Sequence, residues 1–279
     1  AAGPGSANPI GGQIAAIKTA GKRIDDMIVT APVAMKFALG ENPKNVYHGK
    51  NQAPETRMAT ASIIREYLQK TKKYDQAWNK YRIALDKYNR ELEKARATGD
   101  DEPDEPSEPE YDAKCDALLP VIRGELPAHF HAHRADDIFT AIRIAREFGL
   151  RFSIVHCTDG AAIADILAAE GVTAFSGPTL SDRSKPALRS LSFETPGILD
   201  RAGVLIGITT DHPVIPLQYL PLCAALAVRA GMDKKAALRA ITINPAKILG
   251  IDSRVGSLEI GKDADFAVWL GDPLNVMSR

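Results

Sequence analysis

Three of the six histidines of the chain fall within five residues, at alternating positions, in the stretch His129-Phe130-His131-Ala132-His133. Alternate side chains of a β-strand lie on one face, so a strand here would point all three imidazoles in the same direction. Apolar residues then recur at helical spacing up to a glycine stop, at Ile138, Ile142, Ala145, Phe148 and Gly149. The histidines therefore lie where a strand ends and a helix begins, which is the catalytic edge of a barrel built from alternating strands and helices.

The same alternation of strand and helix recurs along the chain and predicts the fold class. Five strands are expected, at residues 33–40, 126–132, 151–156, 172–176 and 204–209. Helices are expected around them, at residues 60–97, 115–123, 138–148, 161–170, 196–202, 219–230 and 234–241. This order is typical of an α/β protein whose parallel sheet closes into a (β/α)8 barrel of the TIM type. Since such a barrel has eight strands, we expect the N-terminal strands to be missing from this sequence.

The first residues of the chain are rich in glycine. A glycine-rich loop can hold phosphate through backbone N–H groups, but residues 1–12 match neither the phosphate-loop nor the dinucleotide fingerprint. We therefore expect a loop that follows an upstream strand, and a short helix or loop over residues 13–24.

The predicted helix over residues 60–97 carries one apolar stripe. Its members are spaced alternately by four and three residues, at Tyr74, Trp78, Tyr81, Leu85, Tyr88, Leu92 and Ala95. We expect the stripe to pack against its own domain, and a contact between two copies of the chain is the alternative. Residues 100–112 hold eight acidic residues and three prolines, which predicts an exposed, mobile loop.

Overall composition narrows the classes of partner. Lys plus Arg and Asp plus Glu both total 35, so nothing indicates a nucleic-acid surface, and no apolar run approaches the roughly 20 residues of a membrane span. The three cysteines are widely spaced, which does not suggest a disulfide framework. We expect a cytoplasmic, reducing compartment, a small-molecule substrate and either a monomer or a homo-oligomer.

Polar residues at three strand ends suggest a metal site. His131, His156 and Asp211 would converge at one rim, and two imidazoles with a carboxylate suit one or two divalent transition metal ions, Zn²⁺ first. Such an ion activates water at neutral pH, and Asp211 is the candidate general base that moves the proton. Glu41 stands at the end of the strand over 33–40, a position that can carry chemistry. Glu41 could take part in catalysis or could be an ordinary carboxylate in a turn.

The order strand-His, strand-His, strand-Asp resembles the amidohydrolase superfamily of metal-dependent barrel hydrolases. The run Thr242-Ile243-Asn244-Pro245-Ala246-Lys247-Ile248-Leu249-Gly250, followed by Val255-Gly256-Ser257-Leu258-Glu259-Ile260-Gly261-Lys262-Asp263-Ala264-Asp265-Phe266, is similar to the C-terminal run of that superfamily. There the chain leaves the barrel, so the resemblance implies a barrel over residues 1–250 and the start of a small β-sandwich over 251–279. Within the superfamily, the chain looks like the imidazolonepropionase-related amidohydrolases of unassigned substrate, a likeness carried by Gly40–Lys44, His131–Ile138 and Thr210–Pro216.

The resemblance also implies roles for individual residues. His131 and His156 would be metal ligands on the fifth and sixth strands, and Asp211 the eighth-strand ligand and general base. Glu41 would bridge two metal ions, with Lys36 as the second choice. His133 would contact substrate or replace His131 as a ligand. Of the remaining neighbours, His129 would lie deeper than the rim, and His212 would lie outside the ligands or on the surface.

Two departures from the superfamily pattern matter. The first-strand His-x-His pair is absent from this sequence, which suggests that the missing N-terminal portion of the protein completes the site. Deaminases and imidazolonepropionase usually carry Glu three residues after the fifth-strand histidine, but position 134 is Arg. We therefore expect hydrolysis of C–N bonds in amides or cyclic amides other than ordinary peptide bonds. A deaminase and a non-catalytic barrel fragment with an assembly role are the alternatives.

Overall fold

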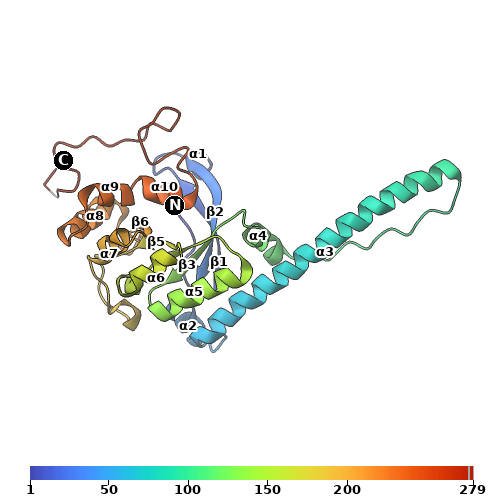
Figure 1. Cartoon of the computed structure of the whole chain (residues 1–279), viewed down its shortest axis with the longest axis horizontal. Helices are drawn as coiled ribbons and strands as arrows, with labels where there is room; N and C mark the ends of the chain where they lie inside the picture. Colours follow the sequence, from blue (N-terminus) through green and yellow to red (C-terminus); the bar gives the residue numbers. More distant parts are fainter. Residues whose placement is uncertain (276, 279) are drawn as a thin grey trace.

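The computed structural model describes residues 1–275 and 277–278 of the chain. Its centre is a six-stranded sheet in which the strands follow one another in chain order, β1 to β6 (Figure 1). β1 is antiparallel to β2, and β2 to β6 are parallel throughout. The strands are β1 (Ile10–Ile17), β2 (Ile28–Ala38), β3 (Ala128–Ala132), β4 (Phe152–His156), β5 (Thr173–Ser176) and β6 (Leu205–Ile208).

Helices fill the connections between the strands. α2 (Glu41–His48), α3 (Arg57–Thr98) and α4 (Ala113–Ile122) join β2 to β3, and α5 (Ala135–Phe148) joins β3 to β4. A 3₁₀ turn (Thr158–Ile163) and α6 (Ala164–Ala169) follow β4, and α7 (Thr195–Arg201) precedes β6. After β6 come α8 (Leu220–Arg229), α9 (Lys234–Ala240) and α10 (Ile243–Leu249), while the short α1 (Ile24–Met27) lies between β1 and β2.

The five predicted strands are confirmed, with ends within a few residues except that β2 begins five residues earlier, at Ile28. The expectation for residues 13–24 is wrong, because most of that stretch belongs to β1 and to its turn into β2. Glycines at positions 11 and 12 hide the strand in the sequence, since glycine lowers strand propensity. Alternate residues Ile14 and Ala16 are nevertheless buried, as in a strand with one covered face.

The two faces of the parallel sheet differ in chemistry. One face carries Phe37, Phe130, Ile154 and Ile206, which are fully buried in the main apolar core under the helices. Phe37 and Phe130 stack with ring centroids 5.0 Å apart, so β2 and β3 are joined by aromatic packing as well as by their ladder. The other face carries the polar residues Lys36, His129, His131 and Ser153, with Phe175 beside His129. The sheet therefore separates an apolar core from a polar interior, as the wall of a TIM barrel does.

Asn244 gives a structural reason for part of the C-terminal run. β6 is the last strand of the sheet, so its outer edge has backbone groups without a neighbouring strand. The buried side chain of Asn244, from α10, donates a hydrogen bond to the carbonyl of Ile206 at 3.0 Å. α10 is thereby fixed against this edge.

The segment after α10 forms turns against the β1–β2 end of the molecule. Arg254 donates to the carbonyl of Val29, and Lys18 pairs with Asp263 at 2.9 Å. Among the described residues beyond Leu249 there is no strand, so the expected start of a β-sandwich over 251–279 is not confirmed. None of the helices in the described residues is both long and apolar enough to cross a membrane.

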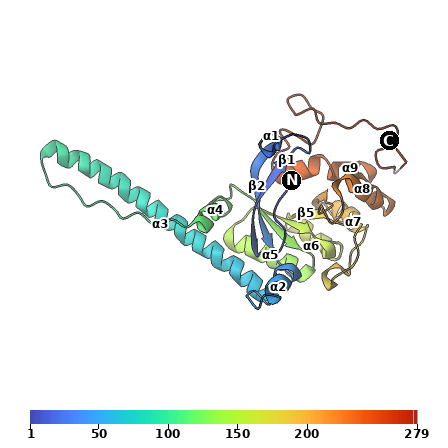
Figure 2. The same ribbon diagram turned by 180° about the vertical axis from the view of Figure 1, so that it is seen from behind.

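α3 and the segment that follows it form an arm that projects from the sheet (Figures 1 and 2). The segment over residues 99–112 returns along α3 to α4 in both views. Two ion pairs, each 2.6 Å long, join the root of the arm: Lys70 with Asp112, and Arg123 with Asp75. Gly99 ends α3 in the left-handed conformation, which glycine adopts without steric cost.

The returning segment explains the apolar stripe of α3. Its three prolines, Pro103, Pro106 and Pro109, are half-buried, while its acidic residues between 100 and 110 are exposed. A polyproline helix has three residues per turn, so this spacing places the prolines on one face. On α3 the stripe is half-buried and Ala95, near the tip, is buried. The acidic side chains are thus exposed as predicted, and the half-buried prolines and stripe fit a segment that runs along α3.

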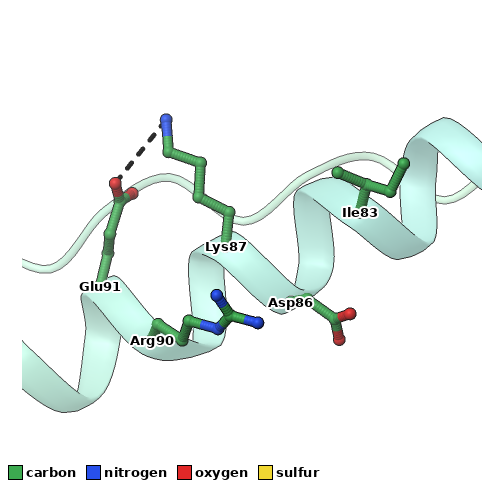
Figure 3. A pocket seen from close by; sticks show the side chains of 5 residues that line it. All are labelled: Ile83, Asp86, Lys87, Arg90 and Glu91. Carbon is green, nitrogen blue, oxygen red and sulfur yellow. Dashed lines mark ion pairs between the residues drawn. The ribbon is translucent and has the colours of Figure 1, made fainter.

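The opposite side of α3 remains in solvent. Figure 3 shows Ile83, Asp86, Lys87, Arg90 and Glu91 around a shallow depression on this helix, with Lys87 and Glu91 paired at 3.7 Å. Ile83 is 71% exposed. All five side chains come from one helix, so this depression offers little enclosure for a small ligand.

We predict that Trp78→Ala loosens the arm without affecting the sheet. Truncating a fully buried Trp costs about 3–5 kcal/mol, so this half-buried one should cost about 2 kcal/mol, or roughly 30-fold in local opening. Hydrogen exchange of the α3 amides beyond residue 80 would measure it. Ile83→Ala, on the exposed side, is the matched control and should change exchange by no more than about threefold; equal effects of the two variants would contradict the packing described.

Candidate metal centre

Three histidines meet at the carboxyl edge of β3 and β4. The ligand nitrogens of His131, His133 and His156 all lie within 4.8 Å of one another, and all three residues are buried. The ring centroids are 4.8 Å apart for His131 and His133, 4.4 Å for His131 and His156, and 4.5 Å for His133 and His156. The alternation of the sequence thus brings His131 and His133 to one face as predicted, and β4 brings His156 to them.

His156 reaches the group through an unusual backbone conformation. Simple alternation along β4 would place it on the opposite face from Ser153 and Val155. Instead His156 has φ 79° and Cys157 has φ 49°, both in the left-handed region. This region is uncommon for residues other than glycine and is found at functional sites, so the end of β4 holds strain that redirects the imidazole.

Hydrogen bonds fix two of the three rings. His156 Nδ1 lies 2.7 Å from the carbonyl oxygen of Gly177, and His133 Nδ1 lies 2.8 Å from Thr158 Oγ1. A carbonyl can only accept, so His156 donates through Nδ1 and leaves Nε2 as an acceptor. By contrast, both ring nitrogens of His131 are buried without a hydrogen-bond partner. Gly177 and Thr158 were not foreseen; the glycine after a predicted strand was the only signal for either.

Burial keeps the three imidazoles neutral. It lowers the pKa of His131, His133 and His156, and the repulsion of neighbouring positive charges adds to this effect for each ring. Neutral imidazole is the form that binds a metal ion.

The residues present fit a divalent transition metal ion. Buried, unpaired nitrogens of His131 require a partner that the described residues do not supply. Three neutral nitrogens with two rings oriented by outer hydrogen bonds are the arrangement found around catalytic zinc. His131, His133 and His156 are therefore the residues that would hold such an ion.

Asp211 lies near this group but outside it. It follows β6 in the left-handed conformation, with φ 51°, and its side chain is exposed. Its charge raises the pKa of His156, against the larger effect of burial, and it also raises the pKa of Lys36. Asp211 is not among the donors that lie within 4.8 Å of one another. The neighbouring His212 is exposed, as expected.

Glu41 belongs to a different cluster. The predicted turn over 40–44 is the start of α2, and there the Glu41 carboxylate accepts from Arg57 at 3.2 Å. Arg57, at the start of α3, also approaches Asp136 at 3.3 Å and Asp137 at 3.6 Å. Glu41 is absent from the group of metal-type donors; its Oε1 accepts from Arg57, and its Oε2 is buried without a hydrogen-bond partner among the described residues.

Two lysines add positive charge to the polar side of the sheet. Lys36 lies beside His129 in the register of β2 and β3, and burial lowers its pKa. His129 lies deeper than the rim group, as predicted, and burial lowers its pKa to about 3. Lys185, from the connection between β5 and α7, lowers the pKa of His131, His133 and His156 together with their burial.

Arg134 is turned away from the site. Its guanidinium donates two hydrogen bonds to Asp136, at 3.1 and 3.0 Å. Position 134 therefore supplies neither a carboxylate nor a metal ligand. All three cysteines are buried and free, and none belongs to the histidine group.

Comparison with known proteins gives a consistent result. The model of the "Amidohydrolase family" matches residues 30–278. The crystal structure of an amidohydrolase from Thermotoga maritima MSB8 superposes with a TM-score of 0.86 at 43% sequence identity, covering 99% of this chain and 67% of that one. This likeness supports a TIM-barrel-like fold, of which the six-stranded sheet is the part seen here.

Two curated relatives are more distant. The chain is 28% identical over 297 residues to the amidohydrolase tasK of Hapsidospora irregularis, covering 98% of this chain and 28% of the relative. It is 30% identical over 151 residues to the imidazolonepropionase of Maricaulis maris (strain MCS10), covering 52% of this chain and 35% of the relative. The chain thus spans about a third of the length of these two proteins.

We predict that Gly177→Ala weakens metal binding. Gly177 has φ +127°, and an added Cβ would meet the carbonyl oxygen of Thr209 at 2.3 Å, so the loop that carries the acceptor for His156 must move. Loss of such an outer hydrogen bond typically lowers metal affinity about 10- to 100-fold. Competition with a chelator would measure the zinc affinity. The control is Gly203→Ala, at φ +93° with no atom within 4 Å; a similar loss in both variants would attribute the effect to general strain.

A second prediction concerns Asp137, whose pKa burial raises to about 6. This pKa lies above its unfolded value, so the associated stability is complete below about pH 4 and is lost as pH rises to about 6. Asp137→Asn should therefore raise the free energy of unfolding at pH 7 by about 1–3 kcal/mol, and the gain should vanish near pH 4. Urea unfolding at several pH values would measure it. Asp136→Asn, at the 53% exposed neighbour, should give no such gain; a pH-independent effect of Asp137→Asn would refute this assignment.

Proposed function

The chain belongs to the amidohydrolase family, and from that premise we propose that it is part of a metal-dependent hydrolase of C–N bonds in amides or cyclic amides. The observation that carries the proposal is the group of three buried, neutral imidazoles at the carboxyl edge of β3 and β4. Active sites of barrel enzymes lie at this edge of the sheet. The ion proposed for it is Zn²⁺, which imidazole ligands suit.

His131, His133 and His156 are the proposed metal ligands. The sequence favoured a substrate contact for His133, but its ring lies between 4.5 and 4.8 Å from the other two, which supports a ligand role. A zinc ion so held would lower the pKa of bound water toward about 7 and polarise the carbonyl to be attacked. Thr158 and Gly177 keep two of the rings oriented for this purpose.

Asp211 is the proposed general base. It stands at the end of β6, it is open to solvent, and its charge acts on His156. A carboxylate in this place would take a proton from the attacking water and deliver it to the leaving nitrogen. Its left-handed backbone is the same kind of strain that redirects His156 at the end of β4.

The same family includes reactions that would release a different product. In a deaminase the substrate would lose ammonia without gaining a carboxylate. Arg134, paired with Asp136, stands where the resemblance places Glu in deaminases and imidazolonepropionases. This difference favours hydrolysis of other amides or cyclic amides over both of those reactions.

We predict that Asp211→Asn retains zinc but lowers turnover at least about 100-fold, the usual size of a general-base effect. Zinc content by elemental analysis and kcat on a panel of cyclic amides and N-acyl amino acids would measure the two properties. Asp182→Asn, an exposed carboxylate in the β5–α7 connection, is the matched control. Unchanged turnover in Asp211→Asn would remove Asp211 from the mechanism. Absence of bound zinc in the unaltered protein would favour a non-catalytic role.

A further inference from the structure

The connection between β5 and α7, residues 177–194, is built as an ordered strap. Arg183 donates to the carbonyl of Leu191 at 2.8 Å, and Ser181 donates to that of Pro178 at 3.3 Å. The 3₁₀ turn Pro186–Leu188 lies in its middle, and Leu188 and Leu191 are buried. The strap follows the carboxyl end of β5. It therefore begins at the same edge of the sheet as the histidine group, which lies at the carboxyl ends of β3 and β4.

One side chain of this strap crosses to another part of the molecule. Lys185 Nζ donates to Asn42 Oδ1, in the first turn of α2, at 2.7 Å. Asn42 Nδ2 in turn donates to Ser6 Oγ at 2.6 Å. The strap, α2 and the N-terminal segment are therefore linked through Lys185, whose position is defined at its charged end.

Lys185 is a half-buried cation with unused hydrogen-bonding capacity. Its ammonium group has three N–H donors, and one is used by a neutral amide. Within the described residues, no carboxylate lies within the 4.0 Å of an ion pair with it. Partial burial of a charge without a counterion is unfavourable, and an anionic ligand would supply the missing partner.

Lys185 lies at the same end of the sheet as the metal centre. It comes from the connection that follows β5, and its partner Asn42 stands just after β2, while the three histidines come from the ends of β3 and β4, which lie between these two strands in the sheet. The pKa of Lys185 is lowered by burial and raised by Glu41 and Asp211. Glu41, the larger of these two influences, is already paired with Arg57.

We propose that Lys185 binds a carboxylate of the substrate, so that the site takes amides or cyclic amides that carry a free carboxylate near the bond to be cleaved. This inference rests on the hydrolase proposed above, and it adds the class of substrate. Asn42 is a positioning residue, because it holds the ammonium group toward the rim without needing to touch the ligand. The alternative role of Lys185 is a tether that closes the strap onto α2.

A pair of probes that differ only in charge separates these roles. N-acetyl-L-alanine carries a carboxylate, and N-acetyl-L-alaninamide replaces it with a neutral amide. With the zinc-loaded protein, we expect kcat/KM to favour the acid. Lys185→Met should reduce the ratio of acid to amide about 10- to 100-fold, mainly through KM, as expected for loss of a charge-assisted hydrogen bond. Lys185→Arg should restore part of the ratio.

The control variant is Arg189→Met, which removes an exposed cation from the same strap. It should leave the ratio of acid to amide within about twofold. A pure tether predicts that Lys185→Met lowers kcat/KM for both probes alike. That result, or the absence of any preference for the acid in the unaltered protein, would overturn the proposal.

Calorimetric binding of the same two probes keeps the inference separate from the proposed function. If neither probe is hydrolysed but the acid binds more tightly to the unaltered protein than to Lys185→Met, the anion site stands and the hydrolase proposal is in question for these substrates. If neither compound is hydrolysed and the acid shows no binding advantage that depends on Lys185, the anion site is refuted. In both cases zinc content, measured alongside, tests the metal centre independently.

Discussion

The burial of three imidazole rings in mutual contact is the constraint on which the rest of the site depends. Rings 4.4–4.8 Å apart and out of solvent cannot carry positive charge together without a large cost. The same burial leaves nitrogen lone pairs without water, most clearly at His131. A metal ion, which accepts electron pairs, would provide the partner that these nitrogens lack. The packing that buries the rings therefore also prepares them to bind a metal ion. The charges around the site influence which molecules bind there. Lys36 and Lys185 are the positive charges among them.

Sequence periodicity was sufficient for much of the fold and for part of the site. The strands after position 28 could be predicted because their apolar runs end in polar residues or glycines, and the shared face of His131 and His133 follows from the two-residue repeat of a strand. β1 was missed, since Gly11 and Gly12 carry no side chains to reveal alternation. The exposed acidic loop over 100–112 could be predicted from its composition, but the meaning of its proline repeat could not, because a repeat of three becomes informative only with a partner helix beside it.

Other properties of the site depend on contacts that the sequence does not display. The alternation rule alone would direct His156 away from His131, and only the left-handed backbone at the end of β4 reverses it. Nothing in the sequence indicates that Glu41 would pair with Arg57, which the packing of α3 brings to it. Lys185 and Asn42 are 143 positions apart in the chain, so their contact is a product of the assembled sheet.

The arm formed by α3 and residues 99–112 has a consequence for how the chain can vary. The first part of α3 packs on the core, but beyond the ion pairs that join Lys70 to Asp112 and Asp75 to Arg123 the arm consists of α3 and the segment that returns along it. The entropy of closing a loop grows only slowly with its length, so the sheet should be nearly indifferent to how far the arm extends. The turn at Gly99 is thus a permissive point, where a foreign peptide or a whole domain could be inserted and displayed at a distance from the histidine group.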